Sequence, residues 1–187
     1  MYDYLRSSFF YLLNKKKYKF LSSSAVVQKL LRVEGRKNIS IEKNVIIQKM
    51  TWLAAVPLTN EEKCNLIIGE GSIIGHLNHI YATGEIIIGK NVLTADKVYI
   101  SDNLHQYENI NLPIMHQGIK QLSKLQIGDG SWIGENVCII GANIGKNCVI
   151  GSNSVVTKDI PDYCVAVGSP ARIIKKYNIA LQKWEKV

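Results

Sequence analysis

Histidine side chains are the first candidates for chemistry in this sequence of 187 residues, because a neutral imidazole accepts a proton from a hydroxyl group near pH 7. The four histidines are His76, His79, His105 and His116. His105 and His116 lie in the stretch 102–124, which has no regularly spaced aliphatic residues, whereas the sequence on both sides of it is periodic. A segment without a packing pattern inside a periodic chain is where function is to be sought. His105, at the start of that stretch, is therefore the leading candidate for a general base.

The periodic sequence that must position this stretch repeats every six residues. An aliphatic residue opens each repeat and a glycine often follows it, as at Ile68, Ile88, Ile127, Ile133 and Ile144. A six-residue period of this kind is typical of a parallel β-helix, in which each repeat makes a short strand and a corner. The aliphatic side chains point inward, so isoleucine stacks on isoleucine in successive coils. The sequence therefore predicts an all-β solenoid.

Three segments near the C-terminus resemble the signature of the hexapeptide-repeat acyltransferases. They are the repeats at 127–134, the run from Ile150 to Pro161, and Val167-Gly-Ser-Pro-Ala-Arg172. The segments 100–105 and 112–118 resemble the subgroup that O-acetylates capsular and lipopolysaccharide sugars. Galactoside, maltose and xenobiotic acetyltransferases are more distant relatives in this resemblance.

The resemblance covers about residues 65–175 and implies most of the biochemistry. It implies a left-handed parallel β-helix, a handedness that the six-residue period alone does not predict. It also implies acetyl-CoA as the co-substrate, a sugar or polysaccharide as the acceptor, and a homotrimer with an active site at each subunit interface. No metal is expected.

The resemblance places the catalytic base at His105, the position at which the family keeps its catalytic histidine. A base works better when its second ring nitrogen is held by an acceptor. Asp102 is the nearest carboxylate in the sequence. A backbone carbonyl or the neighbouring subunit are the alternatives for this role.

Other polar residues are candidates for the acceptor side of the site. Asn78 or His79 would steady the acceptor hydroxyl or the oxyanion, as polar residues near this repeat do in relatives; otherwise they are surface residues. Alternation along a short strand places His76 and His79 on opposite faces. His116 and Tyr107, within the irregular stretch, would line the acceptor pocket.

The donor is predicted to bind in the groove between the coils of two subunits. Pantetheine would pair with backbone amides around Ala142 and Ser152, and cations would bind the phosphates of coenzyme A. Lys158 and Arg172 stand in motifs where relatives contact the nucleotide end of the donor. Trp132 would stack beside the donor, or else only pack against its own coil.

The N-terminal segment carries most of the charge of the protein. Residues 1–37 hold nine basic and two acidic residues, a net charge of +7, whereas the other 150 residues hold fourteen basic and thirteen acidic residues. Periodicity predicts a basic amphipathic helix, with one apolar face made by Tyr2, Leu5, Phe9 and Leu12. No nucleic-acid-binding motif is present, so no nucleic acid is expected as a partner.

Two roles remain open for this segment. The helix would cover the open end of the β-helix, or residues 1–20 would attach the protein to an anionic membrane. The apolar run from Phe9 to Leu13 is too short to span a bilayer. We expect a cytoplasmic protein, with peripheral association at the inner membrane face as the further alternative.

The predicted organisation has three parts. A basic amphipathic helical segment covers residues 1–35, the β-helix covers 36–172 with an excursion loop at 102–124, and a short tail, expected to be helical, covers 173–187. The four cysteines lack the spacing of metal or disulfide motifs, so they are predicted to be reduced core residues of a cytoplasmic protein.

The predicted function is an acetyl-CoA-dependent O-acetyltransferase that acts on a sugar hydroxyl of a surface polysaccharide or its precursor. A sugar-nucleotide N-acetyltransferase is the main alternative, because an amine acceptor needs a similar base. A non-catalytic β-helix scaffold is the third, although His105 and the C-terminal signature argue against it. A zinc carbonic anhydrase shares this fold, but the pair His76 and His79 does not match its ligand spacing.

Overall fold

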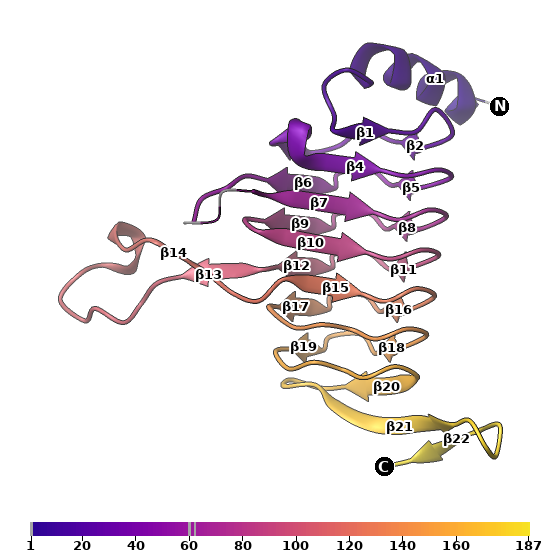
Figure 1. The fold of residues 1–187 in the computed structure, drawn as a ribbon, viewed down its shortest axis with the longest axis vertical. Helices are drawn as coiled ribbons and strands as arrows, with labels where there is room; N and C mark the ends of the chain where they lie inside the picture. The colour runs from indigo at the N-terminus through magenta and orange to yellow at the C-terminus, as the bar shows by residue number, and fades with distance from the viewer. Residues whose placement is uncertain (1, 60, 62) are drawn as a thin grey trace.

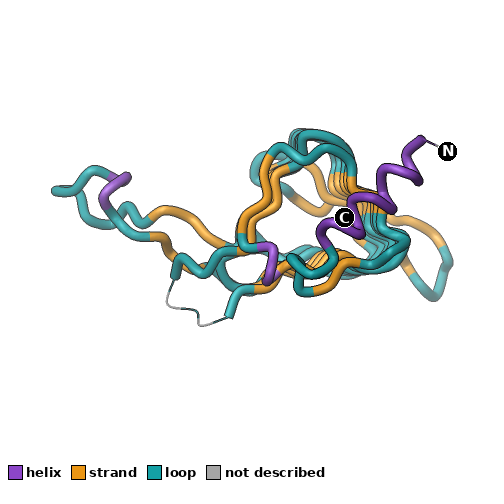
Figure 2. The backbone as a smooth tube through the Cα atoms, turned by 90° about the horizontal axis from the view of Figure 1, so that it is seen from above, coloured by secondary structure: helices purple, strands orange, loops and turns teal. Residues whose placement is uncertain are grey.

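The computed structural model describes residues 2–59, 61 and 63–187, with side chains from residue 7 onward. The coils of the chain stack into a three-sided column, and each side is a sheet whose strands run parallel except at the C-terminal end of the second sheet (Figures 1 and 2). The helix α1 (Tyr2–Asn14) lies across one end of the column, and a two-stranded arm projects from its side. The chain visits the three sides in turn, and in the last coils the first side is continued only by the single-residue bridges at Ile144 and Ile160.

The first sheet contains β1 (Phe20–Leu21), β4 (Ile39–Ile41), β7 (Asn65–Ile68), β10 (Glu85–Ile88) and β15 (Leu125–Ile127). The second sheet contains β2 (Val26–Val27), β5 (Ile46–Ile47), β8 (Ile73–Ile74), β11 (Leu93–Thr94), β16 (Trp132–Ile133), β18 (Val149–Ile150), β20 (Cys164–Val167), β21 (Arg172–Asn178) and β22 (Lys183–Lys186). The third sheet contains β3 (Arg32–Glu34), β6 (Trp52–Ala55), β9 (His79–Ala82), β12 (Tyr99–Ser101), β17 (Cys138–Ile140) and β19 (Val155–Val156). The arm contains β13 (Asn103–His105) and β14 (Ile119–Gln121), and the two 3-10 helices are η1 (Arg36–Asn38) and η2 (Ile114–His116).

Inside the column, an aliphatic side chain of each coil stacks on that of the next. Ile41 pairs with Ile68, and Ile68 pairs with Ile88. The ladder continues from Ile88 to Ile127 and then to Ile144. None of these five side chains is more than 2% exposed. Their repeat position was predicted to point inward, and the structure confirms this, because parallel pairing places equivalent residues directly above one another.

The corners between strands require left-handed backbone, which explains the glycines and asparagines of the repeat. Asn91, Asn136 and Asn147 have φ angles of 53°, 57° and 47°. Asparagine tolerates this conformation better than most residues with a Cβ atom. Gly130 has φ of 71°, and a Cβ atom there would collide with the side chain of Asn147 in the coil below. The left-handed backbone and the close side chain of Asn147 together favour glycine at this position.

The first coil begins earlier than the sequence analysis predicts. The helix ends at Asn14 and does not extend to residue 35. Leu21 and Val27 are six residues apart and buried, and they pair with Ile41 and Ile47 of the next coil. The prediction missed this coil because its aliphatic residues are not followed by glycine, although their spacing already follows the period.

The C-terminal tail is also different from the prediction, since it forms strands and not a helix. The chain reverses after β20, and β21 pairs antiparallel with β20, while β22 pairs antiparallel with β21. The rings of Tyr177 and Trp184, on neighbouring strands, have centroids 5.4 Å apart. The second sheet therefore offers a strand edge onto which the tail adds, and cross-strand aromatic contact stabilises the hairpin.

Candidate active site

The arm, residues 102–124, leaves the column where the third sheet turns into the first. β12 ends at Ser101, and β15 begins at Leu125. Between them, β13 and β14 pair antiparallel, with His105 opposite Ile119. Figures 1 and 2 show this hairpin extending outward, well beyond the coils. The stretch that lacks the repeat in the sequence is therefore a ribbon that projects from one corner of the column.

A buried carboxylate anchors the root of the arm. Asp102 is fully buried, and its two oxygens accept hydrogen bonds of 2.8 Å from the backbone N–H groups of Thr83 and Gly84. The Asn103 amide donates to the same carboxylate at 3.1 Å. Gln121, on the returning strand, donates to the backbone carbonyl of Asp102 at 2.9 Å. Charge-assisted bonds of this type are strong, so they fix the direction in which the arm leaves.

Asp102 does not orient His105, contrary to the prediction. The imidazole of His105 is exposed at the end of β13, and no hydrogen bond joins it to another described residue. Three residues of extended chain span about 10 Å, so the strand carries His105 away from the column. The Asp102 carboxylate instead turns inward, because the N–H groups of the corner above it need an acceptor.

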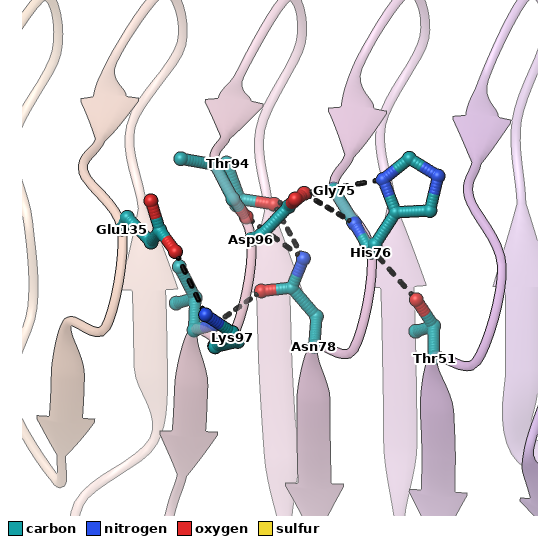
Figure 3. A network of polar contacts seen from close by, with 10 residues as sticks. Thr51, Gly75, His76, Asn78, Thr94, Asp96, Lys97 and Glu135 are labelled. Carbon is teal, nitrogen blue, oxygen red and sulfur yellow. Dashed lines mark hydrogen bonds and ion pairs between the residues drawn. The ribbon is translucent and has the colours of Figure 1, made fainter.

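Asn78 is a corner residue and not a substrate-binding one, so this prediction was wrong. Its side chain is 1% exposed. The amide nitrogen donates to the Ala95 carbonyl at 3.0 Å, and the amide oxygen accepts from the Val98 N–H at 2.8 Å. Figure 3 shows Asn78 among the corner residues of the neighbouring coil, with His76 beside Asp96. Both ends of the Asn78 amide are occupied by backbone, which leaves nothing for an acceptor.

His79 lies in an aromatic cluster on the outer face of the third sheet. Its ring stacks on Trp52 with centroids 4.1 Å apart and planes inclined by 9°, and the rings of Tyr81 and Tyr99 lie 5.8 and 5.2 Å away. Burial lowers the pKa of His79, and its Nε2 has no hydrogen-bond partner among the described atoms. The predicted alternation fails because His76 precedes β9 and occupies a corner.

This cluster is separate from the arm. β9 pairs with β12, whereas His105 lies four residues beyond the end of β12, on the projecting ribbon. The structure therefore does not bring His79 and His105 together within one chain. Tyr107 and His116 are exposed on the arm itself, in the same hairpin as His105.

Polar contacts within the arm hold its outer part together. The Gln117 amide donates to the carbonyls of Asn109 and Leu112, both at 2.9 Å, and accepts from the Asn109 N–H at 3.2 Å. Lys120 and Glu108 form an ion pair at 2.7 Å, and this contact lowers the pKa of Glu108 to about 2. The sequence analysis did not identify Gln117 or Gln121, since a glutamine alone carries no signal of its partners.

The predicted donor residues lie on two different sides of the column. Ala142 and Lys158 follow β17 and β19, in the corners directly below the root of the arm. The Ala142 side chain is buried, so only its backbone can contact a ligand. Trp132, in β16, is 49% exposed on the second sheet, and Arg172 begins β21 of the same sheet.

Ser152 is exposed in the corner that follows β18, between the second and third sheets. Of the predicted donor residues, Ala142 and Lys158 therefore lie along the edge of the column from which the arm with His105 projects, and the others do not. Lys158 and Arg172 form no ion pair with any described residue, so their charges are open to an anionic ligand.

A cavity of about 890 Å³ lies between the root of the arm and the loop that follows β6. Its lining is polar and includes Thr59, Lys63, Gln106, Lys120 and Gln121. Gln121 Oε1 accepts hydrogen bonds of 2.8 Å from the hydroxyls of Thr59 and Thr83, which ties this loop to the arm. Gln106 lines the cavity, but its neighbour His105 does not.

Metal-binding groups are not assembled in the described part of the chain, where no three His, Cys, Asp or Glu side chains gather as a potential metal site. The four cysteines are free thiols, and Cys64, Cys148 and Cys164 are buried, as expected for core residues, whereas Cys138 is only partly buried. Burial, together with the negative charge of Asp102, raises the pKa of Cys64 to about 12. A thiol of that kind is inert as a nucleophile.

Comparison with known proteins agrees with this architecture. Residues 124–158 match the family model described as the hexapeptide repeat of succinyl-transferase. The galactoside O-acetyltransferase of Escherichia coli K12 is 33% identical over 151 residues, which cover 78% of this chain and 70% of that protein. The chain belongs to the hexapeptide-repeat acyltransferase family. A second member, the putative lipopolysaccharide biosynthesis O-acetyl transferase WbbJ of the same bacterium, is 39% identical over 115 residues, 58% of this chain and 59% of that protein.

Several curated relatives match over only part of their length. The chain spans 39%, 59% and 56% of the length of three relatives, WbbJ among them, that are 39–42% identical to it. Among solved structures, the N-acyltransferase AntD of Bacillus cereus, in complex with dTDP and 3-hydroxybutyryl-CoA, superposes with a TM-score of 0.74. It covers 91% of this chain and 89% of AntD at 20% identity, which is a likeness of fold.

Proposed function

We propose that this chain is an acetyl-CoA-dependent O-acetyltransferase that modifies a sugar hydroxyl of a surface polysaccharide or its precursor. The observation that carries the proposal is the placement of His105. It is an exposed imidazole on a hairpin whose root is fixed by the buried Asp102 carboxylate. The galactoside and lipopolysaccharide O-acetyltransferases among the relatives support the acceptor class.

In the proposed reaction His105 acts as the general base. Its neutral imidazole takes the proton of the acceptor hydroxyl while the oxygen attacks the thioester carbonyl of acetyl-CoA. The new bond is the acetyl ester, the carbon–sulfur bond breaks, and the proton passes from the imidazolium to the leaving thiolate. Atoms, charge and electrons balance in these reaction steps without a metal or a redox partner.

We further propose that the active protein is a homotrimer of left-handed parallel β-helices. The support is the division of the candidate residues between two sides of the column. His105, Ala142 and Lys158 lie along one edge, whereas Trp132 and Arg172 lie on the second sheet. A cyclic trimer sets one side of each subunit against a different side of the next, so the two groups meet across the interface.

The donor would then lie between two subunits, with its phosphates near unpaired cations. Lys158 of one subunit and Arg172 of its neighbour are exposed and make no ion pair with a described residue. Trp132, half exposed, offers a ring beside the same groove. Use of acetyl-CoA and the free buried thiols are both in keeping with a cytoplasmic protein.

The test is acetyl transfer by the purified protein from labelled acetyl-CoA to polysaccharide repeat units, free sugars and amino sugars. The His105→Ala variant is expected to lower kcat by about 10²–10⁴-fold, the usual contribution of a general base, while the affinity for coenzyme A changes little. The matched control is His76→Ala, which removes a part-exposed imidazole from a corner of the column and should leave turnover unchanged. Full turnover by His105→Ala would reject this base, and transfer to amino sugars alone would favour the N-acetyltransferase alternative.

A further inference from the structure

The helix α1 is apolar on two sides, and only one of them is covered. Phe10 and Tyr11 pack against the core of the column, and the Phe10 ring lies 6.3 Å from that of Tyr18. Phe9 and Leu12 are 65% and 63% exposed on the other side. A helix that only capped the column would be polar outward. The predicted face of Tyr2, Leu5, Phe9 and Leu12 thus points to solvent at its described positions; the side chains of Tyr2 and Leu5 lie outside the described residues.

The exposed apolar surface continues from α1 onto the end of the column. Leu13 is 55% exposed on the helix, and Leu31 is 56% exposed in the first coil. Both line a groove of about 440 Å³ between α1 and the strands β2 and β3, together with Phe9. Met50, 40% exposed, lies next to this groove, since its N–H donates to the Lys29 carbonyl at 2.8 Å. A patch of this kind marks an interaction surface.

Cations surround this apolar patch. Lys15, Lys16 and Lys17 directly follow the helix and are exposed, and Lys29 and Lys49 line the groove. None of the five forms an ion pair with a described residue. The ammonium group of Lys15 lies 5.5 Å from the centre of the Tyr11 ring, which keeps it beside the helix. Residues 1–37 carry a net charge of +7, so this end of the molecule is strongly positive.

We propose that this end of the protein is a docking surface for an anionic lipid bilayer. The apolar side chains Phe9, Leu12 and Leu13 would enter the headgroup boundary, and the lysines would contact the lipid phosphates. The combination of exposed apolar side chains and lysines distinguishes a lipid surface from a nucleic acid as the partner. A nucleic acid would use the cations but would gain nothing from exposed leucines, whereas an amphipathic helix flanked by lysines matches both parts of a lipid surface.

The position of α1 gives this docking a defined geometry. The helix lies at the end of the column in Figure 1, and the arm leaves from β12, three strands below β3 in the third sheet. With about 4.8 Å between strands and about 10 Å for the helix, His105 would lie about 25 Å from the bilayer. No described helix has the length and apolar character to cross a bilayer, so this docking is peripheral. It goes beyond the proposed reaction and does not depend on it.

Vesicle flotation with the full-length protein tests the proposal. Wild type is expected to float with vesicles of phosphatidylglycerol and phosphatidylcholine at low salt and to be released from them at high salt. It should not float with vesicles of pure phosphatidylcholine. The triple substitution Lys15→Gln, Lys16→Gln and Lys17→Gln should weaken partitioning about 100-fold, from the known contribution of each lysine. Leu12→Gln with Leu13→Gln should weaken it at least about tenfold even at low salt.

The matched control removes three exposed lysines from the corners between the first and second sheets and should float like wild type. Its substitutions are Lys43→Gln, Lys90→Gln and Lys146→Gln. Circular dichroism and thermal unfolding show that each variant is folded. Equal flotation of the two lysine triplets would overturn the proposal. Full flotation of the leucine variant would also overturn the proposal. The lysines alone would then explain the binding, and a nucleic acid would fit such a surface equally well.

Discussion

The Asp102 carboxylate and the backbone N–H of Gly84 lie 2.8 Å apart, and this contact joins the arm to the coil above it. The second carboxylate oxygen accepts from Thr83 in the same corner. A single buried charge thus satisfies two backbone donors that would otherwise be left without partners. Asp102 therefore fixes the start of the strand β13 that carries His105, although no hydrogen bond joins the two side chains.

Asp102→Asn should lower both stability and turnover. An amide group keeps one acceptor but presents N–H to one of the two backbone donors, which costs about 1–3 kcal/mol of the free energy of unfolding. A shift of the arm by about 1 Å would reduce kcat by about 10²-fold. Urea denaturation and steady-state kinetics measure the two effects. Glu135→Gln, which breaks an exposed ion pair with Lys97, is the control and should change neither. An unchanged kcat in Asp102→Asn would show that the anchor does not position the base.

His79 should make the stability of the protein depend on pH. Burial lowers its pKa, against a smaller opposing effect of Glu34. The unfolded chain, with a histidine pKa of about 6.5, then takes up a proton that the folded protein does not, so the free energy of unfolding falls as the pH drops below 6.5.

The substitution His79→Phe keeps a ring on Trp52 but removes the titration. We expect a smaller difference between the urea midpoints at pH 7.5 and pH 5.5 than in wild type. His116→Phe, at an exposed position, should retain the wild-type difference. If His79→Phe keeps it as well, other groups cause the pH dependence.

Mixed trimers should recover activity when the two defects lie on opposite sides of the column. His105→Ala alters the arm edge, and Arg172→Ala alters the second sheet. In a random one-to-one mixture, about one quarter of the interfaces combine an intact edge with an intact face, so about a quarter of wild-type turnover should return. Mixed trimers of His105→Ala and Lys158→Ala are the control. Both defects lie on the same edge, so no interface is intact, and recovery there would contradict the shared site.

Gln117→Ala should loosen the outer part of the arm. The substitution removes the contacts to Asn109 and Leu112, so the backbone amide of Asn109 loses its acceptor. We expect hydrogen exchange at that amide to be about tenfold faster. Amides of the buried strand β10 serve as an internal reference and should exchange as in wild type. Equal exchange at Asn109 would mean that the hairpin holds its shape without Gln117.

Much of the column was predictable because each repeat carries its own signal. Ile68, Ile88 and Ile127 point inward for a local reason. Side chains alternate between the two faces of every strand, and the face toward the inside of the column excludes water. Asn147 marks a corner for an equally local reason, the left-handed backbone. The coil around Leu21 and Val27 was missed because its corners lack the glycine that made the other repeats visible.

The sequence by itself determined the stack of coils, the family and the place where the arm interrupts the period. Only the tertiary structure decided what the polar residues do. Asp102 and Asn78 turned out to bind backbone in neighbouring coils, because a donor about twenty residues away in the chain lies in the coil above Asp102 and in the coil below Asn78. The outward face of α1 and the division of the donor residues between two sides of the column were decided in the same way. The register between adjacent coils sets the contacts of Asp102 and Asn78, and it depends on the number of residues in the coil between the paired strands, which no single six-residue motif encodes.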